Sequence, residues 1–183
     1  MGRDGADPGR RGGSVDILLI AGLPGAGKTR LALALNERLG WLRLSRDDIR
    51  AGEFAAAGEA GKALAWGELL RRLDATLGAG RGAIVEGLPF SRRSELAAVA
   101  ALAARHGAAY HLLWLDCPLP LAQSRVGHAD SHDAPDRDAA LVAAVAARFE
   151  PLPTEAFRLD AAQAFEAVLA AADAWLSRRL RRK

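Results

Sequence analysis

The sequence predicts an α/β fold in three layers, with a five-stranded parallel sheet and helices on both of its faces. Short apolar, strand-like segments alternate with longer helix-like segments along almost the whole chain, an order typical of parallel sheets with crossover helices. The length of 183 residues, of which 50% are hydrophobic, suits one domain with one substantial core. We expect residues 1–13 to form a disordered N-terminal segment and residues 14–183 a single domain.

The first expected strand is an apolar run that ends at a glycine-rich turn, and the first expected helix starts directly after that turn. The five expected strands are Val15–Ala21, Leu42–Leu44, Ala83–Glu86, Tyr110–Leu115 and Phe157–Leu159. The expected helices are Lys28–Leu39, Lys62–Leu77, Ser91–Arg105, Leu119–Val126, Pro135–Phe149 and a C-terminal helix from Ala161.

The positive charge of the chain is concentrated at its end. The net charge is +3, and the tail SRRLRRK alone carries five cations, so residues 14–176 have a net charge of −3. A basic tail of this kind is typical of a solvated helix end, and an acidic body disfavours a nucleic-acid surface.

Two further features bear on the compartment. The single cysteine, Cys117, excludes an intrachain disulfide, and its place at the end of an apolar run predicts a small buried filler. No apolar run approaches the roughly 18 residues of a membrane span, and the polar N-terminus is unlike a signal peptide. We therefore expect a cytoplasmic protein that has no membrane partner.

The segment GLPGAGKT, from Gly22 to Thr29, fits the pattern G-x-x-x-x-G-K-[ST] between an expected strand and an expected helix. Its glycines allow successive backbone N–H groups to point inward, and the start of the helix adds its positive dipole end, which together suit phosphate oxygens. Lys28, one of three lysines in the chain, is expected to reach the β- and γ-phosphates, and the Thr29 hydroxyl to bind Mg²⁺. The expected nucleotide-binding residues are Gly22, Pro24, Gly25, Ala26, Gly27, Lys28 and Thr29.

A second polar segment, SRDDIR, follows the second expected strand. Ligands gather at the carboxyl ends of parallel strands, so Asp47 and Asp48 are expected at the same sheet edge as the phosphate loop. Asp47 can orient a hydroxyl and accept its proton, with a second candidate role as a Mg²⁺ ligand, and Arg50 can bind an anionic group of the acceptor. The alternative makes Ser45 or Asp47 a helix N-cap and Asp48 a first-turn acid.

GLPGAGKT followed about twenty residues later by SRDDIR resembles the P-loop kinases that include polynucleotide 5′-hydroxyl kinases. The continuation from GAIVEGLPF to LDCPLPLAQSRV is similar to small AAA-type ATP-binding kinase-like domains, with chloramphenicol phosphotransferases, gluconate kinases and zeta-type toxins as more distant kin. The resemblance implies a P-loop NTPase fold, ATP and Mg²⁺ as cofactors, and transfer of the γ-phosphoryl group to a hydroxyl. It also implies that Lys28 and Asp47 are catalytic.

The chain departs from the pattern of these relatives in two places. Glu86 stands where they commonly have an aspartate; it can hold a Mg²⁺-bound water, position the acceptor, or cap the following turn. The expected lid, about residues 125–138, is poor in arginine: Arg125 matches the first lid arginine as a catalytic residue, and Arg137 or Arg148 would have to replace the others. A depleted lid leaves an alternative function open, that of an ATP-binding switch or binding module with weak or no transfer.

The acidic body and the lack of an aromatic ladder for single strands favour a small-molecule acceptor slightly over a nucleic-acid 5′ end. Trp66 is a candidate for lining the acceptor site, whereas the other tryptophans are expected in the core. Asp116 is expected to be structural rather than a metal ligand. His128, Asp130, His132 and Asp133 are expected on a mobile loop rather than in a metal site.

Overall fold

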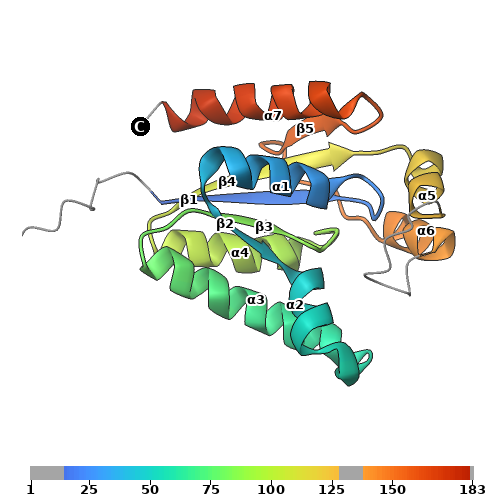
Figure 1. Cartoon of the computed structure of the whole chain (residues 1–183), viewed down its shortest axis with the longest axis horizontal. Helices are drawn as coiled ribbons and strands as arrows, with labels where there is room; N and C mark the ends of the chain where they lie inside the picture. The colour runs from blue at the N-terminus through green and yellow to red at the C-terminus, as the bar shows by residue number, and fades with distance from the viewer. Residues whose placement is uncertain (1–14, 128–137, 182–183) are drawn as a thin grey trace, which may run out of the picture.

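The structure is a computed structural model of the chain that describes residues 15–127 and 138–181 (Figure 1). It contains one parallel sheet of five strands in the order β2-β3-β1-β4-β5. The strands are β1 (Asp16–Gly22), β2 (Leu42–Ser45), β3 (Ala83–Glu86), β4 (Ala109–Asp116) and β5 (Phe157–Asp160). The predicted number and parallel direction of the strands are confirmed.

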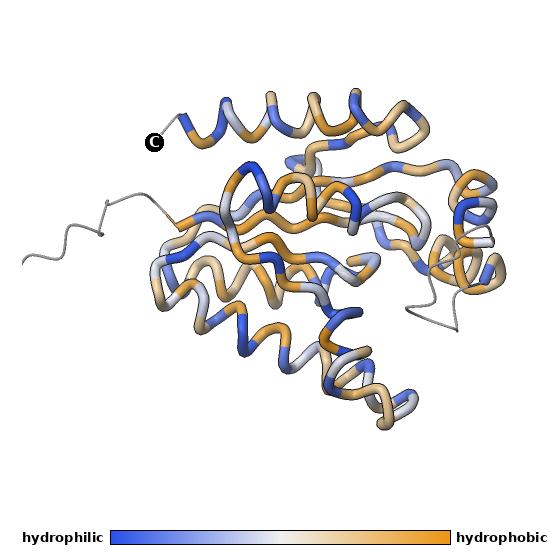
Figure 2. Tube along the Cα trace, in the orientation of Figure 1, coloured by the Kyte–Doolittle hydropathy of each residue, from blue (hydrophilic) through white to orange (hydrophobic). Residues whose placement is uncertain are grey.

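Helices cover both faces of the sheet, as predicted (Figure 1). Helices α1 (Lys28–Leu39) and α7 (Phe165–Leu180) lie on one face, and α3 (Ala60–Gly78) and α4 (Arg93–Arg105) lie on the other. The fully buried strand β1 shows why both faces need a cover. Its Leu18 and Ile20 pack into the core with α1 and α7, while Ile17 and Leu19 pack into the core with α3 and α4, as the two-residue period of a strand requires. Figure 2 shows the resulting hydrophobic centre of the fold.

The helix boundaries differ from prediction where local hydrogen bonds determine them. Helix α7 begins at Phe165, four residues after the predicted start, because the Asp160 carboxylate accepts a hydrogen bond from the Ala162 N–H at 2.9 Å and forms a turn. Helix α6 (Ala139–Ala147) begins after Asp138, whose carboxylate accepts from the Leu141 N–H at 2.7 Å. The expected segment from Pro135, Arg137 and the His128–Asp133 cluster lie outside the described residues, as does the N-terminal segment 1–13.

Two short elements follow β2, the helix α2 (Arg46–Glu53) and the 3₁₀ turn η1 (Ala55–Ala57). On the opposite side of β1, helix α5 (Leu119–Gly127) follows β4 and packs against α6. Because all strands are parallel, their carboxyl ends meet at one edge, and the segments that follow β1, β2 and β3 converge there. Within the described part of the chain, no helix has the length and apolar character needed to cross a bilayer.

Candidate active site

The loop between β1 and α1 follows the phosphate-binding pattern and is fixed by close contacts. Gly25 has a φ of +83°, and a Cβ atom at this position would lie 2.4 Å from the Ala122 carbonyl oxygen of α5. Both the positive φ and this contact require glycine. Gly27 precedes the first turn of α1, so the N-terminus of that helix opens onto the loop.

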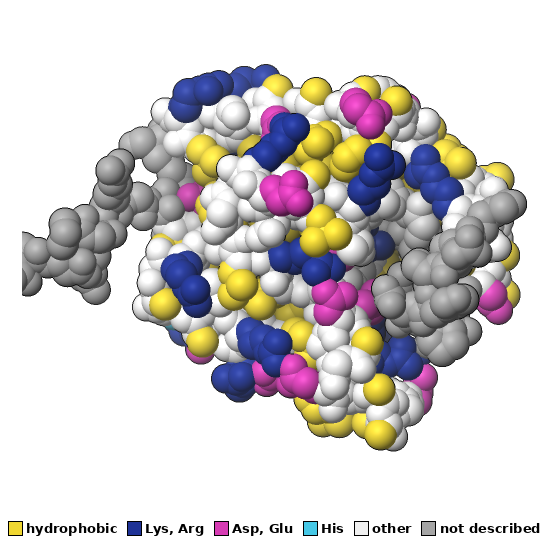
Figure 3. Space-filling view, in the orientation of Figure 1, with side chains coloured by type: hydrophobic (Ala, Val, Ile, Leu, Met, Phe, Trp, Pro, Cys, Tyr) yellow, Lys and Arg dark blue, Asp and Glu magenta, His cyan; other side chains and the backbone are white. Residues whose placement is uncertain are grey.

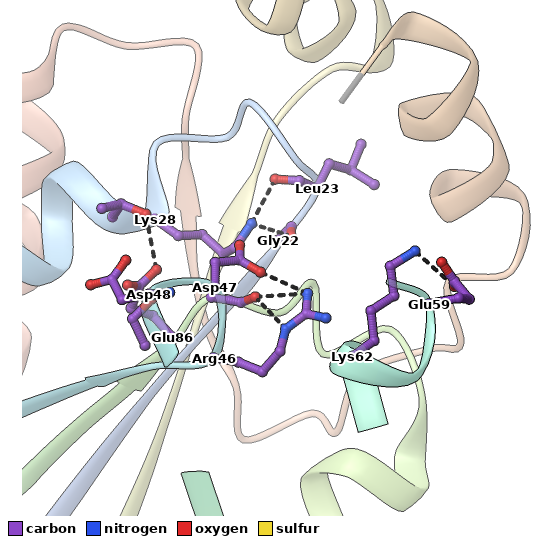
Figure 4. Close-up of polar contacts among 12 residues, drawn as sticks. Gly22, Leu23, Lys28, Arg46, Asp47, Asp48, Glu59, Lys62 and Glu86 are labelled. Atoms are coloured by element: carbon purple, nitrogen blue, oxygen red, sulfur yellow. Dashed lines mark hydrogen bonds and ion pairs between the residues drawn. The ribbon is translucent and has the colours of Figure 1, made fainter. Parts of the chain in front are cut away.

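Lys28 extends back over this loop, as Figure 4 shows. Its ammonium donates to the carbonyl oxygens of Gly22 and Leu23 at 3.0 and 2.9 Å. These bonds hold a positive charge at the position where the loop would receive phosphate oxygens. Gly22 itself ends β1 beneath the loop, where a Cβ would lie 2.6 Å from the Leu115 carbonyl oxygen.

The Thr29 hydroxyl donates to the Glu86 carboxylate, with 3.0 Å between Thr29 Oγ1 and Glu86 Oε2. Glu86 ends β3, and its side chain has no exposed surface. The second oxygen, Oε1, accepts from Arg43 at 2.5 Å. Glu86 is thus held between β2 and α1, and it does not serve as the cap of the following turn. Hydroxyl and carboxylate oxygens are hard ligands, so Thr29, with Glu86 behind it, fits a site for Mg²⁺.

Arg43 contacts Glu86 and Asp48, although the sequence does not predict it as a site residue. It lies on β2 and donates to Asp48 Oδ2 at 2.6 Å as well as to Glu86. Burial opposes its charge, but the hydrogen bond that Arg43 donates to Asp48 and the negative charge of Glu86 raise the pKa of Arg43 above its ordinary value. The guanidinium therefore remains charged between two carboxylates.

Helix α2 brings Asp47 to the cleft. Ser45 is the N-cap, and its hydroxyl oxygen accepts from the Asp48 N–H at 3.3 Å, so the capping interpretation holds for Ser45. Asp47 lies in the first turn, and its Oδ1 is 2.8 Å from Nη2 of Arg46. Figure 4 shows the Asp47 carboxylate between the ends of Lys28 and Arg46. One carboxylate thus faces both the phosphate loop and a neighbouring guanidinium.

Arg46 also fixes the segment after β3. Its Nε and Nη2 donate to the Gly87 carbonyl oxygen at 3.2 and 3.1 Å. Gly87 has a φ of +87°, and a Cβ at this position would lie 2.6 Å from the Arg46 backbone nitrogen. The backbone at Gly87 therefore packs directly against the start of α2, and this contact determines where Asp47 lies.

Several of these residues line one cleft of about 720 Å³. The cleft brings together Lys28, Thr29, Asp47, Arg50, Glu86 and Arg125 from the predicted set, together with Pro24, Gly25 and Gly27 of the loop. Eight cationic side chains and four carboxylates line it, so the cleft is basic although the body of the chain is acidic. Trp66, the candidate for lining the acceptor site, also lines the cleft, and its ring packs edge-on against the ring of Phe90.

A second, smaller cleft of about 230 Å³ lies across the phosphate loop, and no sequence motif predicts it. Apolar side chains from Leu31, Leu115 and Val168 line it, and Ala26 of the loop contributes to it. At its rim the Arg30 guanidinium lies 3.8 Å above the Phe165 ring. Because Gly25, Gly27, Arg30 and Arg125 line both clefts, one elongated ligand could occupy both.

Two arginines, one from the expected lid and one after it, lie at the site. Arg125 on α5 lines both clefts, and Arg148 at the end of α6 lines the larger one. Cys117 is buried, as expected of a filler, and burial raises the pKa of its thiol. Asp116 accepts a hydrogen bond from Arg158 of β5 at 2.7 Å, which agrees with its expected structural role.

The sequence profile of the AAA domain matches residues 17–152. No curated protein matches the sequence. Among solved structures, a sugar kinase from a Janibacter species has a TM-score of 0.68 at 21% identity, over 89% of this chain and 95% of that chain. A gluconokinase from Sinorhizobium meliloti has a TM-score of 0.69 at 16% identity, over 91% and 94%.

The APS kinase of Mycobacterium tuberculosis, in complex with AMPPNP and APS, has a TM-score of 0.64 at 18% identity, over 93% of this chain and 99% of that chain. At these identities the likeness shows the fold, which is that of P-loop kinases.

Proposed function

The chain belongs to the AAA domain family, and we propose that it is an ATP-dependent phosphotransferase that moves the γ-phosphoryl group to a hydroxyl of a small molecule. One observation carries the proposal: a phosphate loop with its lysine and a carboxylate suited to act as a base line the same cleft. Lys28 and Thr29 come from α1 and Asp47 comes from α2, and these helices follow β1 and β2, the two strands that flank β3 in the sheet.

The two clefts suggest how ATP would lie. The phosphates would follow the loop toward Lys28, and the base would enter the smaller cleft, whose apolar floor suits a flat aromatic ring. Arg125, at the border, can reach the phosphates from the lid side. The acceptor would then occupy the larger cleft between α2, α3 and α4.

Asp47 is placed to orient the acceptor hydroxyl and to take its proton as the new bond to the γ-phosphorus forms and the bond to the β-phosphate oxygen breaks. Lys28, Arg125 and Arg148 can offset the charge on the transferring group and on the departing ADP. Mg²⁺, bound by Thr29 with Glu86 behind it, would offset charge on the β- and γ-phosphates. The presence of Arg148 in the cleft favours transfer over a pure ATP-binding switch.

The acceptor side of the cleft favours a small polyhydroxylated molecule. Cations and carboxylates are interspersed along α2 and at the starts of α3 and α4, and both signs are also interspersed on the face seen in Figure 3. The residues are Arg46, Asp47, Arg50, Glu59, Lys62, Arg92 and Glu95. Such a mixed wall offers hydrogen-bond donors and acceptors to hydroxyl groups, and the half-buried Trp66 offers a face for a sugar-like ring. The sugar kinase and the gluconokinase among the similar structures support this class of acceptor.

The test is transfer of label from γ-labelled ATP with Mg²⁺ to a panel of sugars, sugar acids, nucleosides, aminocyclitols and 5′-hydroxyl oligonucleotides. We expect label in a small molecule, and Asp47→Asn should lower turnover by a factor on the order of 10² or more while ATP affinity stays nearly constant. Glu53→Gln is the matched control, since it changes a carboxylate on the same helix that pairs with Arg72, away from the cleft.

Three results would contradict parts of the proposal. Label found only in oligonucleotides, with a steep loss in added salt, would identify a nucleic-acid acceptor. ATP binding that Lys28→Ala abolishes, without label in any acceptor, would favour the switch. Unchanged turnover in Asp47→Asn would remove Asp47 from the role of base.

A further inference from the structure

Arg43 lies next to the cleft and donates hydrogen bonds to two carboxylates from different elements, although no motif marks it. From β2, Nη2 of its guanidinium donates to Oε1 of Glu86 at 2.5 Å, and Nη1 donates to Oδ2 of Asp48 at 2.6 Å. Glu86 stands behind Thr29 and the phosphate loop, whereas Asp48 belongs to the helix that carries Asp47. One side chain thus contacts both the expected metal side and the base side.

We propose that Arg43 is a positioning residue for the phosphoryl transfer. It holds the Glu86 carboxylate in the orientation that directs the Thr29 hydroxyl oxygen toward Mg²⁺, and it fixes the first turn of α2, which presents Asp47. This inference rests on the proposed function, because it concerns the same nucleotide and metal site.

The orientation follows from the two oxygens of Glu86. Arg43 occupies Oε1, so Oε2 faces Thr29, whose Oγ1 lies 3.0 Å away. A carboxylate can only accept hydrogen bonds, so the Thr29 hydroxyl must donate its proton to Oε2. The lone pairs of Oγ1 then point away from Glu86, on the exposed side of Thr29, where a cation could use them.

Placing the Arg43 charge in this environment costs free energy of folding, and this cost indicates a specific role for the side chain. Its side chain is only 16% exposed, and Glu86 is completely buried, so neither charge is well solvated. Within the described residues, Nε of Arg43 is buried and has no hydrogen-bond partner. The guanidinium thus reaches both carboxylates while its Nε–H donor stays without a partner, which costs free energy. A buried ion pair often adds little net stability to a fold, so stability alone does not explain this arrangement.

The two bonds also require an arginine. The planar fork of a guanidinium presents two nitrogens to two separate acceptors, whereas a lysine ammonium is a compact charge on a flexible stem. The bond to Asp48, which is 61% exposed, is worth little as an isolated ion pair. Its contribution is geometric, since Asp48 follows Asp47 directly in the first turn of α2.

The experiment measures the ATP dissociation constant by calorimetry, with excess Mg²⁺ and with a chelator, for the wild type, Arg43→Gln and Arg43→Lys. For Arg43→Gln we expect the dissociation constant with Mg²⁺ to rise by on the order of tenfold, and the value in chelator to stay within about twofold, because residues behind a metal ligand mainly affect the metal. Arg43→Lys should recover part of the loss. Arg72→Gln is the matched control, since Arg72 also bridges two carboxylates, Glu53 and Glu68, outside the cleft.

The possible outcomes separate this inference from the proposed function. If the wild type binds no ATP with Mg²⁺, the proposed function fails. If the wild type binds and Arg43→Gln keeps the full gain from Mg²⁺, the positioning role is overturned. Should Arg43→Gln not fold, as judged by circular dichroism, Arg43→Lys provides the same comparison. If neither variant folds, or if both lose affinity equally with and without Mg²⁺, Arg43 is only structural and the inference is wrong.

Discussion

At the residue scale, the predictable part of the site is the part with a local pattern. Lys28 and Thr29 follow a loop whose glycines fix the backbone, so their positions can be read from eight consecutive residues. The contacts of Arg46 and Arg43 have no such local signal, because their partners Gly87 and Glu86 lie 41 and 43 residues away in the chain. Only the pairing of β2 with β3 brings them together.

The contacts of Lys28 predict that arginine cannot replace it. The compact ammonium reaches two loop carbonyl oxygens at 2.9 and 3.0 Å, and a broad planar guanidinium cannot occupy the same position without opening the loop. Lys28→Arg should therefore weaken ATP binding by on the order of tenfold or more despite the conserved charge. Calorimetric titration with ATP and Mg²⁺ measures this, with the urea unfolding curve as the check that the fold is intact. Wild-type affinity in Lys28→Arg would mean that charge alone suffices.

At the scale of elements, the periodicity of the sequence predicts which helices form, and the capping contacts determine where each helix begins and ends. Helix α1 has the predicted bounds of Lys28–Leu39 because the phosphate loop and Gly40 terminate it on both sides. Helix α7 begins later than the sequence predicts because the turn at Asp160 precedes it. Helix α2 was foreseen only as the alternative in which Ser45 is a cap, since eight residues give a weak periodic signal.

The contact between Gly87 and α2 predicts an effect on stability and on the site together. In Gly87→Ala the new methyl group would lie 2.6 Å from the Arg46 backbone nitrogen, in a backbone region unfavourable for alanine. We expect unfolding free energy to fall by about 2 kcal/mol or more, and turnover to fall with it as Asp47 shifts.

Gly52→Ala on the same α2 helix is the control for Gly87→Ala. Apart from its chain neighbours and the backbone of its own helix, a Cβ at Gly52 would meet no atom of the described residues within 4 Å, so helix propensity should raise stability by about 0.5–1 kcal/mol. Urea unfolding followed by circular dichroism measures both variants. A Gly87→Ala protein as stable as the wild type would show that α2 can shift at no cost.

At the scale of the whole molecule, the sheet topology determines where the site lies, and the side chains that line the cleft determine which ligand it can bind. The parallel sheet could be predicted from alternating segments, and it forces the loops after β1, β2 and β3 to one edge. The acceptor class could not be predicted with the same certainty, because the acceptor wall combines α2 and the start of α3 with the start of α4, which comes after β3. The overall charge also does not predict the charge of the site, because the body of the chain is acidic whereas the cleft is lined by more cations than carboxylates.

Because the cleft joins segments from most of the chain, ATP should stabilise the molecule as one unit. At about 100 times the dissociation constant, a ligand that binds only the folded state adds about 2.7 kcal/mol. For a domain of this size, that corresponds to a rise of roughly 5–10 °C in the unfolding midpoint. We expect calorimetry to show a single transition that moves by this amount with ATP and Mg²⁺. Lys28→Ala should unfold at the wild-type temperature without ligand and show no shift with it. Two separate transitions, only one of which responds to ATP, would contradict the prediction that residues 14–183 form a single domain.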